Sequence, residues 1–138
     1  MIKKEQVILL LLEACPSFTQ KWKEHSADWE EENLLYIDLA EFNRHLIELH
    51  KSKKNDEFPA IFDVVEKLHT EGDDYVREAA AIGLLEGIQN LASHSENGVN
   101  AEEFVQYLKP ESAKWWHQLN EFWEAKIPYV GATINNGL

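Results

Sequence analysis

The chain of 138 residues carries a formal net charge of −12, with 44% hydrophobic and 11% aromatic residues. At this length one domain with a single core is expected, and the aromatic content excludes a disordered acidic chain. The single cysteine excludes an internal disulfide and a multi-thiolate zinc site, and it favours a reducing compartment.

The predicted first helix covers Lys3–Ala14 and ends where Pro16 disfavours helical backbone at Cys15. Its apolar run, residues 7–12, follows two lysines and so imitates a secretory signal. The run is shorter than a signal core, and Glu13 occupies the would-be cleavage site. No stretch of the sequence has the length of a transmembrane helix, so we expect a soluble cytoplasmic protein that does not contact a membrane.

Ser17 followed by Gln20 predicts a capping box that opens a short second helix. Residues 28–33 form a polar, acidic link, and a third helix is predicted over Leu34–Lys51. Its apolar side chains recur at helical spacing and therefore share one face. They are Leu35, Leu39, Phe42, Leu46 and Leu49.

The next two predicted helices meet at a Gly-Asp-Asp turn. The fourth helix ends at Gly72, and Asp73 or Asp74 caps a fifth helix over residues 74–92. Between Ala79 and Ile88 this fifth helix is apolar or small on nearly every side. A helix of that kind is buried all round, so it is predicted to lie at the centre of the molecule.

Asn100 and Glu103 predict the start of a sixth helix, and a seventh is predicted over residues 111–126. The remaining residues, 127–138, have no periodicity and are expected to form a mobile tail. The predicted fold class is therefore all-α, with about seven helices packed as an irregular, HEAT-like bundle in one domain over residues 1–126.

The region around the central helix carries a repeat-like pattern. Pro59 lies in the first turn of one predicted helix, and Asp73, Val76-Arg77 and a run of small residues open the next. This pattern resembles one HEAT repeat, spanning residues 58–91. The resemblance implies that Asp73 caps the second helix and that Arg77 reaches carbonyls or carboxylates of the neighbouring turn. A second copy is not evident, although a solenoid needs about three repeats or more.

Longer strings of the sequence are distributed over most of the chain. They are Glu13 to Phe18, Phe58-Pro59, Glu71 to Ala80, Gly83 to Asn90 and Trp115-Trp116. Together they resemble a family of small bacterial helical proteins of unknown function. By analogy, HEAT-like folds mostly bind proteins, whereas the HEAT-like alkylpurine DNA glycosylases act on DNA through a concave surface.

Polar residues interrupt the apolar surface of the predicted central helix. Glu86 and Asn90 lie one turn apart and share a side with Ala79, Gly83 and Gly87. A carboxylate above small residues suits a general acid or a metal ligand at the floor of a cleft. The alternative is structural, with Glu86 paired to a donor of a neighbouring helix, and it is the favoured interpretation.

The third helix carries a polar stripe beside its apolar face, formed by Asp38, Glu41, His45 and Glu48. Glu41 and His45 are four residues apart, which can place a carboxylate and an imidazole on one metal ion. Such a site needs ligands from another helix, and the candidates nearby in sequence are Glu66, His69 and Glu71. The favoured alternative is a solvated flank with pairs to Arg44 and Lys51.

Two further features suit the binding of another protein. The acidic link contains Asp28, Glu30, Glu31 and Glu32 around Trp29, and it suits a basic partner. The seventh helix has a wide aromatic stripe that is ordinarily core, and Trp115 at its edge is a candidate anchor for a partner or for a second copy of the chain. Arg77 is a further candidate binding residue.

Two functions from different classes remain open. The leading hypothesis is a non-enzymatic interaction module, resembling an immunity protein or antitoxin, that needs no cofactor. The alternative is a nucleic-acid-processing or metal-assisted hydrolase with Glu86, Asn90, Glu41 and His45 around a cleft. The negative net charge disfavours nucleic acid as a partner, and so does the low number of arginines, which is two.

Overall fold

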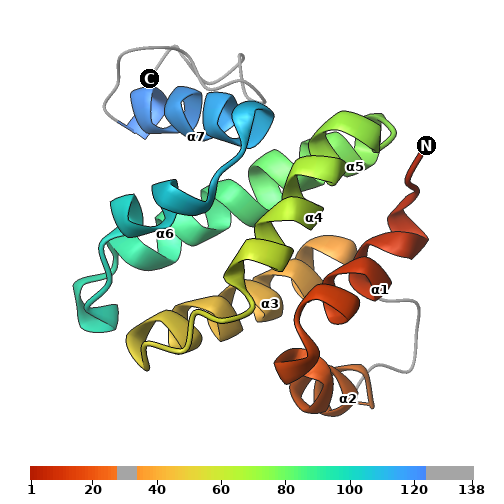
Figure 1. Ribbon diagram of the computed structural model, residues 1–138, viewed down its shortest axis with the longest axis horizontal. Coiled ribbons are helices and arrows are strands. Elements are labelled where there is room, and N and C mark those ends of the chain that lie inside the picture. The colour runs from red at the N-terminus through yellow and green to blue at the C-terminus, as the bar shows by residue number, and fades with distance from the viewer. Residues whose placement is uncertain (28–33, 124–138) are drawn as a thin grey trace.

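The computed structural model describes residues 1–27 and 34–123, and every regular element in these ranges is a helix (Figure 1). The predicted all-α class is therefore confirmed. The elements are α1 (Lys4–Ala14), η1 (Pro16–Phe18), α2 (Thr19–Ala27), α3 (Leu35–Lys51), α4 (Phe58–Glu71), α5 (Asp74–Glu78), η2 (Ala79–Glu86), α6 (Gly87–Ser93), η3 (Ser95–Asn97), η4 (Ala101–Tyr107) and α7 (Pro110–Trp123).

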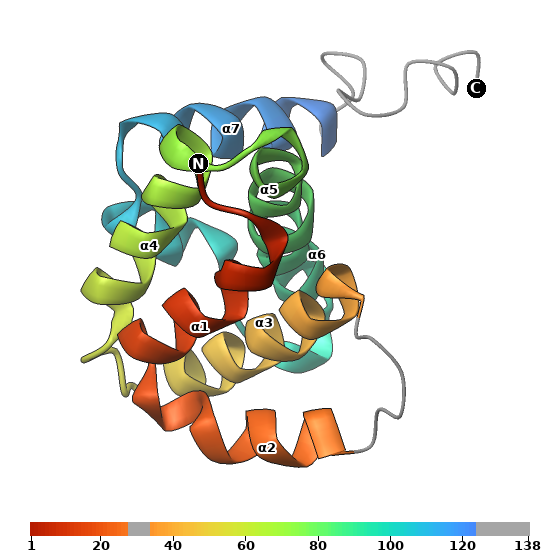
Figure 2. The ribbon, with the colours of Figure 1, turned by 90° about the vertical axis from the view of Figure 1, so that its right-hand side faces the viewer.

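The predicted central helix is present as α5, η2 and α6, which follow one another without a break. It contacts α3, α4 and α7, and α2 and α7 lie at opposite ends of the molecule (Figure 2). Most of its apolar side chains are almost fully buried, as the all-round pattern predicts. They include Val76, Ala79, Ala80, Leu84, Leu85 and Ile88.

The middle of this helix, η2, is a π-helix rather than the expected α-helix. Asn43 of α3 is 1% exposed, and its amide Nδ2 donates to the carbonyl oxygen of Gly83 at 2.8 Å. A Cβ added at Gly87 would collide with the same amide nitrogen. The small residues thus allow α3 to approach closely, and Asn43 bonds to the backbone of the widened helix.

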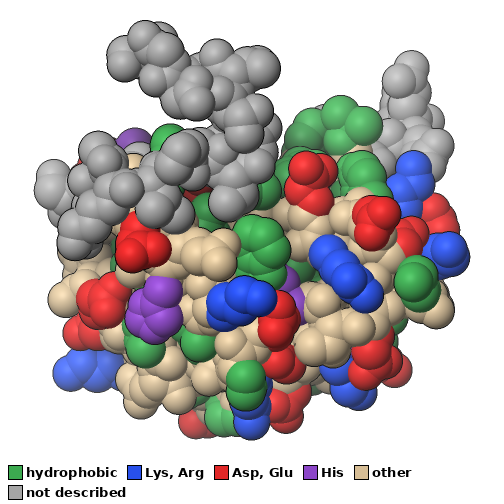
Figure 3. All heavy atoms as spheres, turned by 90° about the horizontal axis from the view of Figure 1, so that it is seen from above, with side chains coloured by type: hydrophobic (Ala, Val, Ile, Leu, Met, Phe, Trp, Pro, Cys, Tyr) green, Lys and Arg blue, Asp and Glu red, His purple; other side chains and the backbone are tan. Residues whose placement is uncertain are grey.

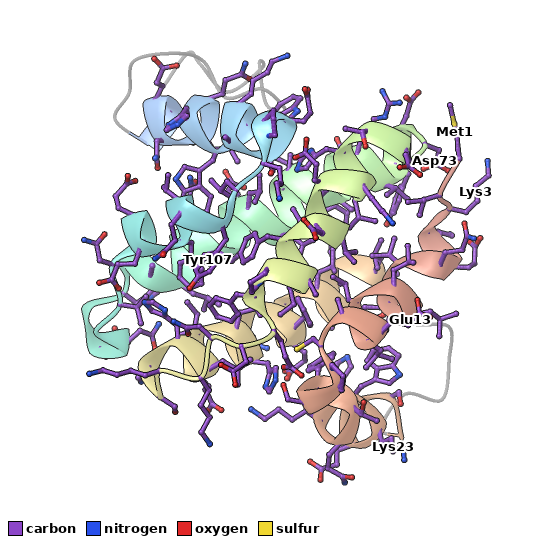
Figure 4. All side chains as sticks on the ribbon, in the orientation of Figure 1. Met1, Lys3, Glu13, Lys23, Asp73 and Tyr107 are labelled. Atoms are coloured by element: carbon purple, nitrogen blue, oxygen red, sulfur yellow. The ribbon has the colours of Figure 1, made fainter. Side chains whose placement is uncertain are left out.

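Aromatic side chains join α4 to the η4 segment. Phe58 and Phe62 of α4 pack against Phe104, and Tyr107, labelled in Figure 4, packs against both of them. Phe58, Phe62 and Phe104 are completely buried. Trp116 of α7 is also completely buried, in agreement with the core position expected for the aromatic stripe of the seventh helix.

The N-terminal residues are attached to the turn between α4 and α5. The backbone N–H of Ile2 donates to the carbonyl of Glu71 at 2.8 Å, and the N–H of Asp73 donates to the carbonyl of Ile2 at 3.0 Å. Lys3 also faces Asp73, with 3.9 Å between Nζ and Oδ2 (Figure 4). These contacts hold the start of α1 at the end of α4.

Most of the predicted helix starts agree with the structure, and one is wrong. Asp73 Oδ1 accepts the N–H of Val76 at 2.9 Å, and Asn100 Oδ1 accepts the N–H of Glu102 at 3.0 Å, although the helix that follows Asn100 is a 3₁₀ helix. Ser17 does not form the expected capping box with Gln20. It lies inside η1, and its side chain contacts residues distant in sequence.

Candidate functional site

A cluster of polar side chains lies where α1, η1, α3 and α4 meet. Cys15 ends α1 because Pro16 follows it, and its side chain is completely buried. His45 projects from the middle of α3 and is 6% exposed. Glu57 is the residue just before α4, and Ser17 belongs to η1. Four segments thus contribute one side chain each to this junction cluster of Cys15, Ser17, His45 and Glu57.

Hydrogen bonds connect all four side chains of the junction cluster. The Ser17 hydroxyl donates to Glu57 Oε1 at 2.5 Å and lies 2.8 Å from His45 Nε2. The Cys15 thiol donates to the same Glu57 oxygen at 3.3 Å, and the backbone N–H of Ser17 donates to Glu57 Oε2 at 3.1 Å. Glu57 therefore accepts three hydrogen bonds, which orient its carboxylate toward the thiol and the serine.

Burial and hydrogen bonding set the charges of the junction cluster. Burial raises the pKa of the Cys15 thiol to about 12, and the nearby Glu57 charge adds to this effect. Burial also lowers the pKa of His45, assisted by Lys21. Burial alone would raise the pKa of Glu57, but the hydrogen bonds from Ser17 and Cys15 outweigh it and lower that pKa. At neutral pH the cluster therefore contains a neutral thiol, a neutral imidazole and one carboxylate.

The donor atoms of this cluster are close enough to share an ion. The ligand atoms of Cys15, His45 and Glu57 all lie within 4.8 Å of one another. Within residues 1–27 and 34–123, this is the one group of three or more Cys, His, Asp or Glu side chains that meets this condition. Glu41, the candidate partner of His45 in a metal site, is not part of this group.

The other members of the polar stripe on α3 bind residues of α2 or of α3 itself. Asp38 lies 3.0 Å from His25 Nε2, and Glu48 lies 2.7 Å from Lys21 Nζ. Glu41 accepts a hydrogen bond from Arg44 at 2.6 Å. Most of the stripe is therefore the seam along which η1 and α2 pack on α3, and within α3 itself Glu41 pairs with Arg44.

The small-residue strip of the central helix is covered by α3. A Cβ added at Gly83 would lie 2.8 Å from Leu39 Cδ1, so no open floor exists at that point of the strip. Glu86, in η2, is half-buried, and Asn90, in α6, is exposed. The structure does not bring either of them into the junction cluster with His45.

The remaining sequence candidates have separate surroundings. Arg77 Nε donates to the carbonyl oxygen of Gly72 at 2.8 Å, which is the contact with the neighbouring turn that the HEAT resemblance implies. Trp115 is half-buried and stacks on His69, with ring centroids 6.5 Å apart. The acidic link of Asp28, Trp29, Glu30, Glu31 and Glu32 and the expected tail, 127–138, lie outside the described residues.

A shallow hollow of about 360 Å³ lies among α1, α2, α3 and α5. Two of the large hydrophobic side chains that line it are exposed: Leu34 at 65% and Tyr75 at 43%. Lys4 Nζ lies 5.8 Å from the centre of the Tyr75 ring. The hollow is lined by Lys4, Glu5, Ile8, Trp22, Leu34, Leu35, Asp38 and Tyr75.

Of the junction cluster, only His45 is a candidate from the sequence. In the sequence, Cys15 and Ser17 have local roles at helix ends, nothing singles out Glu57, and no spacing rule connects residues 15, 45 and 57. The available signal is weak: a cysteine and a serine flank a helix-ending proline, in the string Cys15-Pro16-Ser17. Only the packing of α1, α3 and α4 brings these residues together.

Among the described residues, none of the helices is both long and apolar enough to span a membrane.

Comparison with known proteins identifies a family but no activity. No curated protein and no solved structure matches the chain. The family model described as "Domain of unknown function (DUF7674)" matches residues 8–124. Because this match covers most of the chain, the protein belongs to the DUF7674 family.

Proposed function

We propose that this protein is a non-enzymatic interaction module that binds a basic protein segment, with an apolar side chain of that segment seated in the hollow among α1, α2, α3 and α5. The observation that carries the proposal is the exposure of Leu34 and Tyr75 at this hollow, at 65% and 43%. Large apolar side chains that remain exposed around a concavity are typical of binding surfaces.

Charge supports a basic partner. The sequence directly before Leu34 contains Asp28, Glu30, Glu31 and Glu32, and the chain carries a net charge of −12. Such a charge attracts a cationic protein and accelerates its association. It disfavours a second copy of the same acidic chain at this position. A role like that of an immunity protein or antitoxin toward a cationic partner is consistent with these features.

Nucleic acid is a weaker candidate partner. On the face shown in Figure 3, acidic and basic side chains are interspersed and do not form a continuous basic area. Binding to nucleic acid depends largely on neutralising phosphates with lysine and arginine. The hydrolase alternative has less support as well, because Arg44 holds Glu41 and α3 covers the small-residue strip near Glu86.

Two leucines of similar exposure provide a matched test. Leu34 precedes α3 and is 65% exposed at the hollow. Leu9 is in α1, is 63% exposed and does not line this hollow. Wild type, Leu34→Glu and Leu9→Glu are used as baits in affinity purification at two salt concentrations, with quantitative mass spectrometry. We expect a basic protein that is retained by wild type and Leu9→Glu, lost with Leu34→Glu and weakened by salt.

The recovered protein is then purified and titrated against the same three variants. Leu34→Glu is expected to weaken the binary complex by about 100-fold, since a charge placed at the centre of an interface removes a main anchor. Equal affinities for Leu34→Glu and Leu9→Glu would exclude the hollow as the binding surface. Sedimentation of the protein alone at two concentrations tests self-association, including association through Trp115.

A further inference from the structure

The arrangement of the junction cluster points to a metal site. We infer that Cys15, His45 and Glu57 bind one divalent transition-metal ion of the zinc class. The three ligand atoms lie within 4.8 Å of one another, and Cys15 Sγ and Glu57 Oε1 are 3.3 Å apart. In a tetrahedral zinc site the ligand atoms are separated by about 3.3–3.8 Å, so one edge of the site is already formed.

The Ser17 hydroxyl marks the point on which the three ligands converge. It lies 2.5 Å from Glu57 Oε1, 2.8 Å from His45 Nε2 and 3.5 Å from Cys15 Sγ. An ion between the three ligands replaces these contacts, and the serine side chain turns aside by rotation about χ1. Its backbone need not move, because the Ser17 N–H is held by the other oxygen of Glu57.

The chemistry of the donors selects the class of ion. One sulfur, one imidazole nitrogen and one carboxylate oxygen suit zinc, whereas magnesium and calcium prefer oxygen ligands alone. Binding ionises the Cys15 thiol and releases its proton to solvent, while His45 stays neutral and Glu57 is already ionised. The thiolate and the carboxylate together then balance the two charges of the ion.

The three ligands come from three different parts of the fold. Cys15 ends α1, His45 is in the middle of α3, and Glu57 directly precedes α4. One ion therefore connects three helices that the sequence places far apart. Three protein ligands leave a fourth position open, and it lies toward the exposed Ser17, where water completes the coordination.

Metal binding is tested on the tag-free full chain after removal of bound metal by a chelator. Zinc is titrated in competition with a chromophoric indicator, and cobalt is added as a spectroscopic probe. We expect one equivalent of zinc, and with cobalt a thiolate-to-metal charge-transfer band together with the intense visible bands of a tetrahedral site.

Variants identify the ligands. Cys15→Ser and Glu57→Gln are each expected to weaken zinc binding by about 100-fold or more, and Cys15→Ser also removes the charge-transfer band. The controls His69→Gln and His117→Gln change a buried and an exposed histidine outside the cluster and should leave the affinity unchanged. Circular dichroism establishes whether each variant is folded. If Cys15→Ser does not fold, the Glu57→Gln variant still tests the ligand set.

Three results would overturn this inference. The first is a folded wild-type chain that gives no charge-transfer band with cobalt. The second is zinc affinity that stays the same in Cys15→Ser and in Glu57→Gln. The third is binding that disappears in His117→Gln, because the ion would then occupy a surface histidine. None of these results bears on the interaction surface at Leu34.

Discussion

Two glutamates, one just before α4 and one within it, make similar local contacts but lie in different surroundings. Glu57, just before α4, accepts the hydroxyl and the backbone N–H of Ser17 in η1. Glu66, within α4, accepts the hydroxyl and the backbone N–H of Ser112 in α7, at 2.9 and 3.0 Å. Both serines follow a proline that opens a helical segment. Each carboxylate therefore caps a helix to which it does not belong.

The difference lies in the side chains that surround each carboxylate. Glu66 also accepts the N–H of Glu111, and the nearby His69 stacks on Trp115. The side-chain hydrogen bonds of Glu66 are therefore those of a helix cap. Around Glu57, by contrast, α1 and α3 contribute a thiol and an imidazole. The same capping contact therefore becomes a potential metal site only where a second and a third ligand converge on it.

The largest expected effect that separates the two regions is on acid stability. Burial lowers the pKa of His69 to about 4 from 6.5, against the opposing charges of Glu66 and Glu111. Between these values the unfolded chain binds a proton that the folded chain does not, so stability falls as the pH decreases from 6.5 to 4. The loss is about 3 kcal/mol, and urea denaturation across this pH range measures it.

Replacing His69 with an aromatic residue that does not titrate tests whether His69 causes the loss of stability at acid pH. His69→Phe keeps an aromatic ring against Trp115 and should remove most of the pH dependence, while the same substitution at the exposed His117 should not. A smaller slope remains because burial lowers the pKa of His45 in the same direction. An unchanged slope in His69→Phe would assign the acid loss to other groups.

Zinc should stabilise one of the two regions and not the other. At a free zinc concentration 100-fold above Kd, the free energy of unfolding should increase by about 2.7 kcal/mol. The increase, measured by thermal denaturation, should persist in Glu66→Ala and vanish in Cys15→Ser. Stabilisation that survives in Cys15→Ser would remove the distinction drawn between the two carboxylates.

Removal of the second carboxylate should destabilise the fold without affecting metal. Glu66→Ala leaves the backbone N–H groups of Glu111 and Ser112 without their acceptor, at a cost of about 2 kcal/mol, while the Ser112 hydroxyl keeps the carbonyl oxygen of Lys109. Asp63→Ala is the matched control on the same helix, because Asp63 is paired with Lys109 at 3.3 Å but is largely exposed. Its expected cost is below about 0.5 kcal/mol. Equal losses in denaturant midpoints would contradict the capping role of Glu66.

The smallest effect is expected at Ser17. Ser17→Ala removes a hydroxyl that is a hydrogen-bond partner but not a proposed ligand, and it should cost about 1 kcal/mol in the metal-free protein. Zinc affinity should remain within about threefold of wild type, since all three ligands are retained. A large loss of affinity, measured in the same competition titration, would make Ser17 a fourth ligand.

Local patterns predicted the helical elements well because their physical causes act over a few residues. Periodicity located the buried central helix, Asp73 caps it as expected, and Arg77 bonds to the adjacent turn. The Ser17 capping box was wrong because a partner 40 residues away, Glu57, takes the serine hydroxyl. Likewise, local patterns did not predict the π-helical centre, whose Gly83 carbonyl accepts a hydrogen bond from Asn43 of another helix.

The amino-acid sequence by itself determined the all-α class, the order of the helices and the net negative charge. Only the tertiary structure decided which side chains meet. It placed His45 beside Cys15 and Glu57, whereas Glu41 is hydrogen-bonded to Arg44. The physical reason is range. Helix periodicity and capping depend on neighbours within about four residues, whereas a binding site depends on the packing of helices that no short pattern encodes.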